Sequence, residues 1–383
     1  MTGQASHPDA AEAAGIRDEL RAVARDLLGR AGRGSAADWR LFAGAGWLGL
    51  DAPAALDGAG ASFAEVAVIL QEFGRAAAPG PYLGAVVLGI GTLLLLEPGA
   101  ARDGLLRDVV SGGIVLAAAL TDGSRDSAQE CPPPFRLVAS PGGPRLHGTA
   151  AFVPDAPGAG RLLLLAAGLD GAPVIVDIEP GASGLHVTEQ PVLDATRRFG
   201  LVAADGAAVP PSSLRRFAGD SGEAVRQLLD RAAVALACDS LGLSEAMLDA
   251  TVGYARVREQ FGRPIGSFQA VKHACADMLV QISVARQLVS AAVDRLAGSD
   301  PGAGVAASMA KSQACGSAVQ VTGAAMQLHG GIGYTWESGI HVYLKRAMLN
   351  RSLFGSPAAH RRRLAARYRQ PSQPEPQPLT QIR

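Results

Sequence analysis

Two long predicted helices are joined by the segment Tyr254-Ala-Arg-Val-Arg258-Glu-Gln-Phe261-Gly262-Arg-Pro-Ile265-Gly-Ser-Phe-Gln269, and this junction is the most informative part of the chain. Apolar residues recur with the 3.6-residue period of a helix over residues 223–258 before it and over 268–297 after it. A third helix, predicted over 302–328, leads into a second distinctive segment, Gln327-Leu-His-Gly330-Gly331-Ile-Gly333-Tyr-Thr-Trp-Glu337. Two shorter helices are predicted over 344–354 and 357–367, so the C-terminal part is expected to be a helical bundle.

Residues 114–211 follow a different pattern, in which short apolar runs alternate with turn residues about every 8–12 positions. This spacing predicts antiparallel strands that form a barrel or a sandwich. No helix-length crossover separates the runs, and the GxGxxG fingerprint of dinucleotide-binding βαβ units is absent. Strands are predicted over 114–120, 136–139, 146–152, 161–167, 173–178, 185–188 and 200–203.

The first third of the chain is predicted to be helical. Ser62 followed by Glu65 forms a capping-box pattern that starts a helix over 62–73. Further helices are predicted over 10–29, 38–45, 82–96 and 99–111. We therefore expect an α+β multidomain protein: an N-terminal helical domain over 1–112, a central antiparallel β-barrel or sandwich over 113–221, a C-terminal four-helix bundle over 222–368, and a proline-rich disordered tail over 369–383.

Composition excludes several classes of protein. The 383 residues include 35 Lys+Arg and 35 Asp+Glu, and this zero net charge disfavours nucleic acid or an anionic membrane as the main partner. The four cysteines are far apart and no histidine cluster accompanies them, so we expect no metal site and no disulfide framework. The N-terminus has no apolar signal segment, and the most apolar stretch, over 82–96, is too short to span a membrane. A cytoplasmic protein is expected.

The two distinctive segments carry groups that suit a phosphate-containing ligand. The guanidinium of Arg258 can hold phosphate oxygens, Phe261 offers a ring for stacking, and Gln327 can hydrogen-bond a ribose or a phosphate. Gly330 and Gly331 would let a ligand approach the backbone. The alternative interpretation is that Arg258 caps its own helix and that the glycines only end another.

Together with the helix–β–helix order, these segments resemble the acyl-CoA dehydrogenase family. Shorter matches are Gly46-Trp-Leu-Gly49, Glu72-Phe-Gly74-Arg75, Phe152-Val-Pro-Asp155 and Asp194-Ala-Thr-Arg197. The resemblance implies a non-covalent FAD at a subunit interface, contacted across it by Arg258, Phe261, Ile265, Gln269, Gln327, Gly330 and Gly331, and walled in the β domain by Thr121, Ser127, Phe152 and Val153. The chain departs from the family at Pro154, which has no N–H to donate.

The resemblance also implies a reaction, the α,β-desaturation of an acyl thioester, with an electron-transfer flavoprotein or a similar acceptor taking the electrons. A carboxylate must remove the α-proton, but Phe354 occupies the position where many members have this Glu. A minority of the family carries the base on the long helix just before an Arg, and Asp230 precedes Arg231 there. Asp230 is therefore the candidate catalytic base, although without gaps the expected pair falls on Ala232-Ala233, two residues later. Asp239, Glu337 or no base in this chain are the alternatives.

Three hypotheses follow from the resemblance. The first is an FAD-dependent acyl-CoA dehydrogenase similar to a bacterial branch associated with steroid side chains and other branched or bulky acyl groups. The second is a non-catalytic subunit that completes a flavin site in a heteromer with a paralogue supplying the base. The third is a biosynthetic desaturase acting on a carrier-bound acyl group. A homodimer, a homotetramer and a heteromer all remain open.

Overall fold

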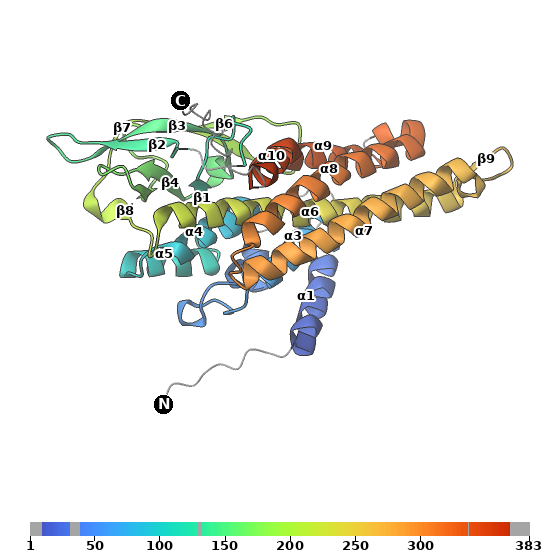
Figure 1. Cartoon of the computed structure of the whole chain (residues 1–383), viewed down its shortest axis with the longest axis horizontal. Helices are drawn as coiled ribbons and strands as arrows, with labels where there is room; N and C mark the ends of the chain where they lie inside the picture. Colours follow the sequence, from blue (N-terminus) through green and yellow to red (C-terminus); the bar gives the residue numbers. More distant parts are fainter. Residues whose placement is uncertain (1–9, 31–38, 129–131, 336, 368–383) are drawn as a thin grey trace, which may run out of the picture.

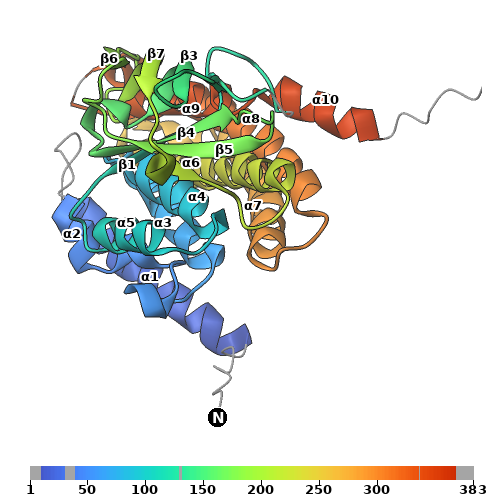
Figure 2. The same cartoon turned by 90° about the vertical axis from the view of Figure 1, so that its left-hand side faces the viewer.

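The computed structural model describes residues 10–30, 39–128, 132–335 and 337–367. It confirms the predicted order of an N-terminal helical part, a central sheet and a C-terminal helical part (Figure 1). Seen end-on, the sheet lies across one side of the helices, and α1 lies on the side away from it (Figure 2). The predicted tail from residue 369 and Cys131 lie outside the described residues. No described helix is long and apolar enough to cross a bilayer.

The N-terminal part contains a helix with the expected capping box and a helix of unexpected type. The Ser62 hydroxyl accepts from the amide of Ala64 at 3.1 Å, and Glu65 accepts from the amide of Ser62 at 2.9 Å. The helix predicted over 82–96 is instead a π-helix followed by a short α-helix. The helices of this part are α1 (Ala10–Arg30), α2 (Trp39–Gly44), α3 (Phe63–Ala76), η3 (Leu83–Ile90), α4 (Gly91–Leu95) and α5 (Ala100–Val110).

The described residues form one open sheet of eight strands in the central part, with the order β6-β7-β3-β2-β4-β5-β8 and with β1 beside β4. Most neighbours are antiparallel as predicted, but β1 and β2 both run parallel to β4. The mostly antiparallel sheet agrees with the expected β unit, and the two parallel pairs arise because the long segment between β1 and β2 lets the chain return before β2 runs in the direction of β1. The strands are β1 (Leu116–Ala119), β2 (Phe135–Val138), β3 (Arg145–Pro154), β4 (Arg161–Ala167), β5 (Pro173–Ile178), β6 (Leu185–Gln190), β7 (Phe199–Ala208) and β8 (Leu214–Arg215).

The C-terminal part consists of long helices that pack closely on one another and on α3. Two glycines permit the contact between α3 and α6: a Cβ added to Gly74 would lie 1.9 Å from the carbonyl oxygen of Asp239, and one added to Gly242 would lie 1.8 Å from that of Gln71. The elements are α6 (Ser221–Val257), a hairpin of β9 (Glu259–Gln260) and β10 (Arg263–Pro264), α7 (Gln269–Ala297), α8 (Ala303–His329), α9 (Ile340–Ser352) and α10 (Pro357–Arg367).

A buried ionic cluster centred on Asp239 joins these parts. Its carboxylate accepts from Arg346 of α9 at 3.0 Å, from Asn350 at 2.6 Å, and from Arg197 of the β domain at 2.9 Å. Arg346 also donates to the carbonyl of Ala78 at 2.7 Å, just after α3. Burial by itself would raise the pKa of Asp239, but Arg346 and Arg197 outweigh it and lower this pKa to about 2.

Replacing Asp239 with Asn is expected to cost about 3–5 kcal/mol of unfolding free energy, because two buried guanidinium groups lose their counter-charge. Urea unfolding at neutral pH measures this loss. The matched control is Asp249→Asn, whose side chain is 65% exposed beside Arg75 and whose replacement should cost about 0–1 kcal/mol. In the unmodified protein the stabilisation that ionised Asp239 contributes is present above about pH 4 and is lost as pH falls toward 2, since its folded pKa lies below the unfolded value. Equal stabilities of the two variants would contradict this role.

Candidate functional site

The two distinctive segments lie side by side at one end of the helical part. The rings of Tyr254, near the end of α6, and His329, at the end of α8, stack with centroids 4.4 Å apart. The β9–β10 hairpin extends beyond this contact to the far end of the molecule (Figure 1). We call the predicted ligand-contacting residues of this region the tip: Arg258, Phe261, Ile265, Gln269, Gln327, Gly330 and Gly331.

The tip presents its groups outward. Phe261 is 91% exposed although its backbone adopts the left-handed conformation at φ 56°. Arg258, Gln269 and Gln327 are exposed, and Ile265 is half-buried. Arg258 is the C-cap residue of α6 through its backbone amide, which donates to the carbonyl of Tyr254 at 2.9 Å. Its side chain has no hydrogen-bond or ion-pair partner within the part of the chain that the structure describes, so the guanidinium takes no part in this cap. An exposed aromatic ring and a free guanidinium form a surface suited to an external aromatic and anionic group.

The two glycines of the tip, Gly330 and Gly331, leave the main chain open to a ligand. Gly330 has φ 60° and ψ −143°, a conformation that essentially only glycine adopts. A Cβ added at Gly330 or at Gly331 would meet no described atom within 4 Å, so the backbone here is open to an approaching group. This is the bare main-chain surface that a phosphate or ribose requires.

The second group of predicted residues, which we call the wall, comprises Thr121, Ser127, Phe152 and Val153. The loop that carries Thr121 and Ser127 is folded over β3, where Asp122 accepts from the amide of Ala151 at 3.3 Å. The far end of the loop is tied to the start of α10, because Asp126 accepts from the amide of Ser356 at 2.7 Å and from its hydroxyl at 2.9 Å. This tie places the loop against the segment that contains Phe354.

Two backbone positions of the wall segment offer no amide hydrogen to a ligand. The amide of Phe152 is already used, since it donates to Gln190 at 2.6 Å, and Pro154 has no amide hydrogen. Thr121 and Ser127 carry hydroxyl groups and are each partly buried, and Val153 is buried. Wall and tip together therefore fit an FAD, with apolar and hydroxyl groups for the ring system and cationic, amide and bare backbone groups for the dinucleotide.

The structure does not bring wall and tip together within one chain. They lie at opposite ends of α9, whose 13 residues span about 20 Å. Within one chain the predicted residues therefore form two separate groups.

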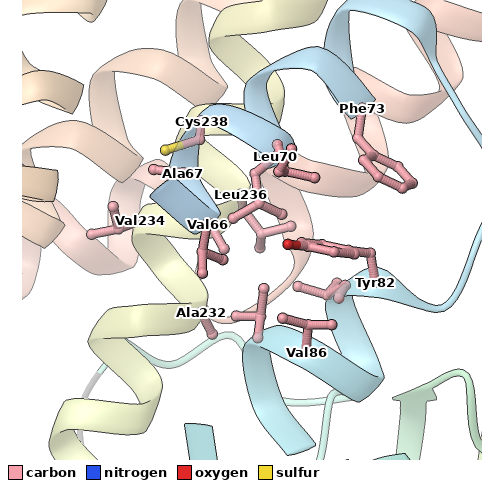
Figure 3. Packing of buried hydrophobic residues seen from close by; sticks show 14 of the residues in the cluster. Val66, Ala67, Leu70, Phe73, Tyr82, Val86, Ala232, Val234, Leu236 and Cys238 are labelled. Carbon is pink, nitrogen blue, oxygen red and sulfur yellow. The ribbon is translucent and has the colours of Figure 1, made fainter. Parts of the chain in front are cut away.

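Neither position expected for a catalytic carboxylate carries one. Phe354 is half-buried, with a left-handed backbone at φ 51°. Ala232 is fully buried in the packed region between α6, α3 and η3, near Val66 and Val86 (Figure 3). Apolar side chains fill the space at this position on α6.

Asp230 has a partner that the sequence did not reveal. Both of its carboxylate oxygens bind the Arg363 guanidinium of α10, one of them at 3.1 Å. Asp230 also lines a cavity of about 430 Å³ whose other walls include Phe63, Leu94 and Leu228. The neighbouring Arg231 lines the same cavity, and its guanidinium lies 2.6 Å from Asp51. The only sequence signal for Arg363 was the basic run His-Arg-Arg-Arg in the predicted last helix.

The two alternative candidates for the base, Asp239 and Glu337, lie in surroundings that do not suit a proton acceptor. Asp239 is fully buried in its ionic cluster, and its pKa of about 2 makes it a weak proton acceptor. Glu337 is exposed, and hydrogen bonds from its own backbone and from Thr335 lower its pKa. Among the described residues, no three His, Cys, Asp or Glu side chains gather as metal ligands.

Comparison with known proteins identifies relatives of both helical parts. Residues 11–112 match the acyl-CoA dehydrogenase N-terminal domain and residues 221–368 match the acyl-CoA dehydrogenase C-terminal domain. Acyl-CoA dehydrogenase IpdE2 of Mycobacterium tuberculosis is 33% identical over 85% of this chain and 85% of its own length. A solved variant of the Tcur3481–Tcur3483 steroid acyl-CoA dehydrogenase is 31% identical, with a TM-score of 0.80 over 92% of this chain and 97% of its own. The ChsE4–ChsE5 complex from Mycobacterium tuberculosis is 26% identical, with a TM-score of 0.81 over 91% and 96%.

The tip can be tested with two neighbouring arginines. Arg258→Ala should lower FAD affinity at least tenfold, the loss expected when a charge-assisted contact of about 1.5–3 kcal/mol disappears. Arg256→Ala changes an exposed arginine two residues earlier on α6 and should leave FAD affinity unchanged. Flavin fluorescence during FAD titration measures both. Equal affinities of the two variants would show that Arg258 does not contact the cofactor.

Proposed function

Because this chain belongs to the acyl-CoA dehydrogenase family of FAD-dependent oxidoreductases, we propose that it takes part in the α,β-desaturation of an acyl-CoA thioester. In this reaction a carboxylate removes the proton on the α-carbon, and the bound flavin supplies the acceptor for the β-hydride. The protein must hold both groups around a single thioester and exclude water from them.

We propose that the flavin site is shared between two chains, with the tip of one chain completing the wall of another. The separation of the two groups along α9 supports this arrangement. So does the exposure of Phe261, which stays 91% exposed although the edge-on ring of Phe268 lies 6.1 Å away between centroids. In this arrangement Arg258 would hold the diphosphate, and Thr121 and Val153 would line the ring system.

We further propose that a paralogous partner chain supplies the base. The observation that carries this proposal is that apolar residues occupy both expected base positions, Phe354 and Ala232. Two other acids considered for this role, Asp230 and Asp239, are bound to arginines. Two structurally similar proteins are described by paired names, Tcur3481–Tcur3483 and ChsE4–ChsE5, and the second is a complex. One of them is described as a steroid enzyme, which favours a bulky, polycyclic acyl-CoA as the substrate.

A second candidate function, a self-sufficient dehydrogenase with Asp230 as the base, is favoured by one observation. Asp230 lines a cavity of about 430 Å³ that has several leucine side chains in its wall and could take an acyl group. For Asp230 to act as a base, Arg363 would first have to release at least one of its oxygens.

Asp230→Asn separates the two candidates. If a partner supplies the base, the flavin in the assembly of this variant with its partner should be bleached by acyl-CoA at close to the unmodified rate, measured by anaerobic stopped-flow absorbance. If Asp230 is the base, the rate should fall by about 10²–10⁴ while FAD stays bound. Arg363→Gln is the control for the broken ion pair, because it disturbs the same contact without removing the carboxylate. A loss of rate in Asp230→Asn that Arg363→Gln does not reproduce would contradict the partner-base proposal.

The partner-base proposal also predicts the behaviour of Phe354→Glu. A carboxylate introduced here should not by itself give a self-sufficient enzyme, because a working base needs tuned surroundings as well as position. Turnover of a straight-chain and a bulky acyl-CoA by this variant, purified without a partner, is the measurement. A gain of about a hundredfold over the unmodified chain, the scale of a general base, would mean that this chain holds a nearly complete conventional site.

A further inference from the structure

Asp155, directly after the wall on β3, has an unusual position. Its backbone is left-handed at φ 61°, and its amide donates to the carbonyl of Arg198 at 2.9 Å. One carboxylate oxygen accepts from the amide of Gly84 at 2.9 Å, in the first turn of η3. The contact is close, because a Cβ added to Gly84 would lie 2.6 Å from that oxygen and 2.9 Å from the carbonyl of Pro154. Asp155 therefore connects the β domain directly to the π-helix of the N-terminal part.

The carboxyl group of Asp155 lies in surroundings that favour its neutral form. Burial raises its pKa to about 7, although the Gly84 amide and the nearby Arg197 and Arg198 act in the opposite direction. Both arginines are engaged elsewhere, Arg197 with Asp239 and Arg198 with Glu189. The facing helix η3 contributes no charge, since its residues, LGAVVLGI, are all apolar.

We propose that Asp155 is a positioning residue whose ionised carboxylate, by binding the Gly84 amide, holds the wall of the flavin site against η3, and that protonation of this carboxylate loosens the wall. The inference rests on the flavin site proposed above. A carboxylate accepts a helix-terminal amide hydrogen more strongly than a neutral acid does, because the bond is charge-assisted and the helix dipole favours negative charge. The wall residues Phe152 and Val153 would then be held most firmly above neutral pH.

The proposed role predicts two opposite effects of rising pH, a fall in overall stability and a rise in flavin affinity. Overall stability should fall as pH rises, because a folded-state pKa above the unfolded value gives a contribution that is complete below about pH 4 and lost by about pH 7. Flavin affinity should rise over the upper part of the same interval, since ionisation tightens the wall. A residue with a merely structural role would show the first effect without the second.

The first test uses the full chain without added flavin. Urea unfolding of the unmodified protein and of Asp155→Asn is compared between pH 5 and pH 8. Relative to the variant, the folding equilibrium constant of the unmodified protein should fall by up to about tenfold per pH unit until pH 7 and then level off. A constant difference between the two proteins across this range would overturn the proposal, because Asp155 would then not titrate there.

The second test follows FAD binding by flavin fluorescence at pH 6 and pH 8, on the chain alone or on its assembly with a partner. The unmodified protein should bind FAD about fivefold more weakly at pH 6, the ratio expected between a neutral and a charge-assisted hydrogen bond. Asp155→Asn, which keeps an acceptor for Gly84 but cannot ionise, should bind equally at both pH values, and Asp155→Ala should bind weakly at both. Glu189→Gln is the charge control, because it changes the exposed partner of Arg198, and it should keep the pH dependence of the unmodified protein.

The outcomes are distinguishable. A pH dependence that persists in Asp155→Asn would overturn the inference and leave the flavin site intact. Absence of FAD binding at every pH, in the chain and in its assembly, would instead contradict the proposed function, and the first test would still decide whether Asp155 titrates.

Discussion

The pairing of the buried Asp239 carboxylate with two guanidinium groups is the interaction on which the arrangement of the three parts depends. Asp239 lies on α6 where α3 crosses it, Arg346 comes from α9, and Arg197 comes from the loop before β7. Neither guanidinium group could stay buried without Asp239, because removing the carboxylate leaves uncompensated positive charge in an apolar interior. The cluster therefore fixes the sheet, the N-terminal helices and the C-terminal helices in one geometry, and the functional groups take their places within it.

In that geometry the functional groups of one chain lie at places that are far apart. The long helix α6 begins beside the cavity that Asp230 lines and ends at the hairpin that carries Phe261, and its 37 residues span about 55 Å. A rigid element of this length cannot bring both of its ends to one ligand. The wall, formed where the sheet meets the start of α10, and the tip, at the other end of α9, are separated for the same reason. A second chain is the simplest source of the missing half, and it can also supply the carboxylate that this chain lacks at Phe354 and Ala232.

Features set by neighbouring residues could be predicted from the sequence, and features set by distant contacts could not. The capping box at Ser62 and the helical period of α6 are local, and both are confirmed. The residues of the tip are also local to two segments, so their grouping could be predicted. The parallel pairing of β1 with β4 depends on contacts across more than forty residues, and the Arg363 partner of Asp230 lies 133 positions away. No short sequence pattern predicts the β1–β4 pairing or the Asp230–Arg363 ion pair. The sequence showed only that Arg231 follows Asp230, and this neighbour alone did not reveal the role of Asp230.

The most direct measurement of whether two chains share the flavin site is to dilute the FAD-loaded assembly and to follow flavin fluorescence and molecular mass on the same samples. If the tip of one chain completes the wall of another, FAD should be released over the same concentration range in which the chains separate, and single chains should carry no flavin. Single chains that retain FAD with the affinity of the assembly would contradict the account, because one chain would then hold the whole site.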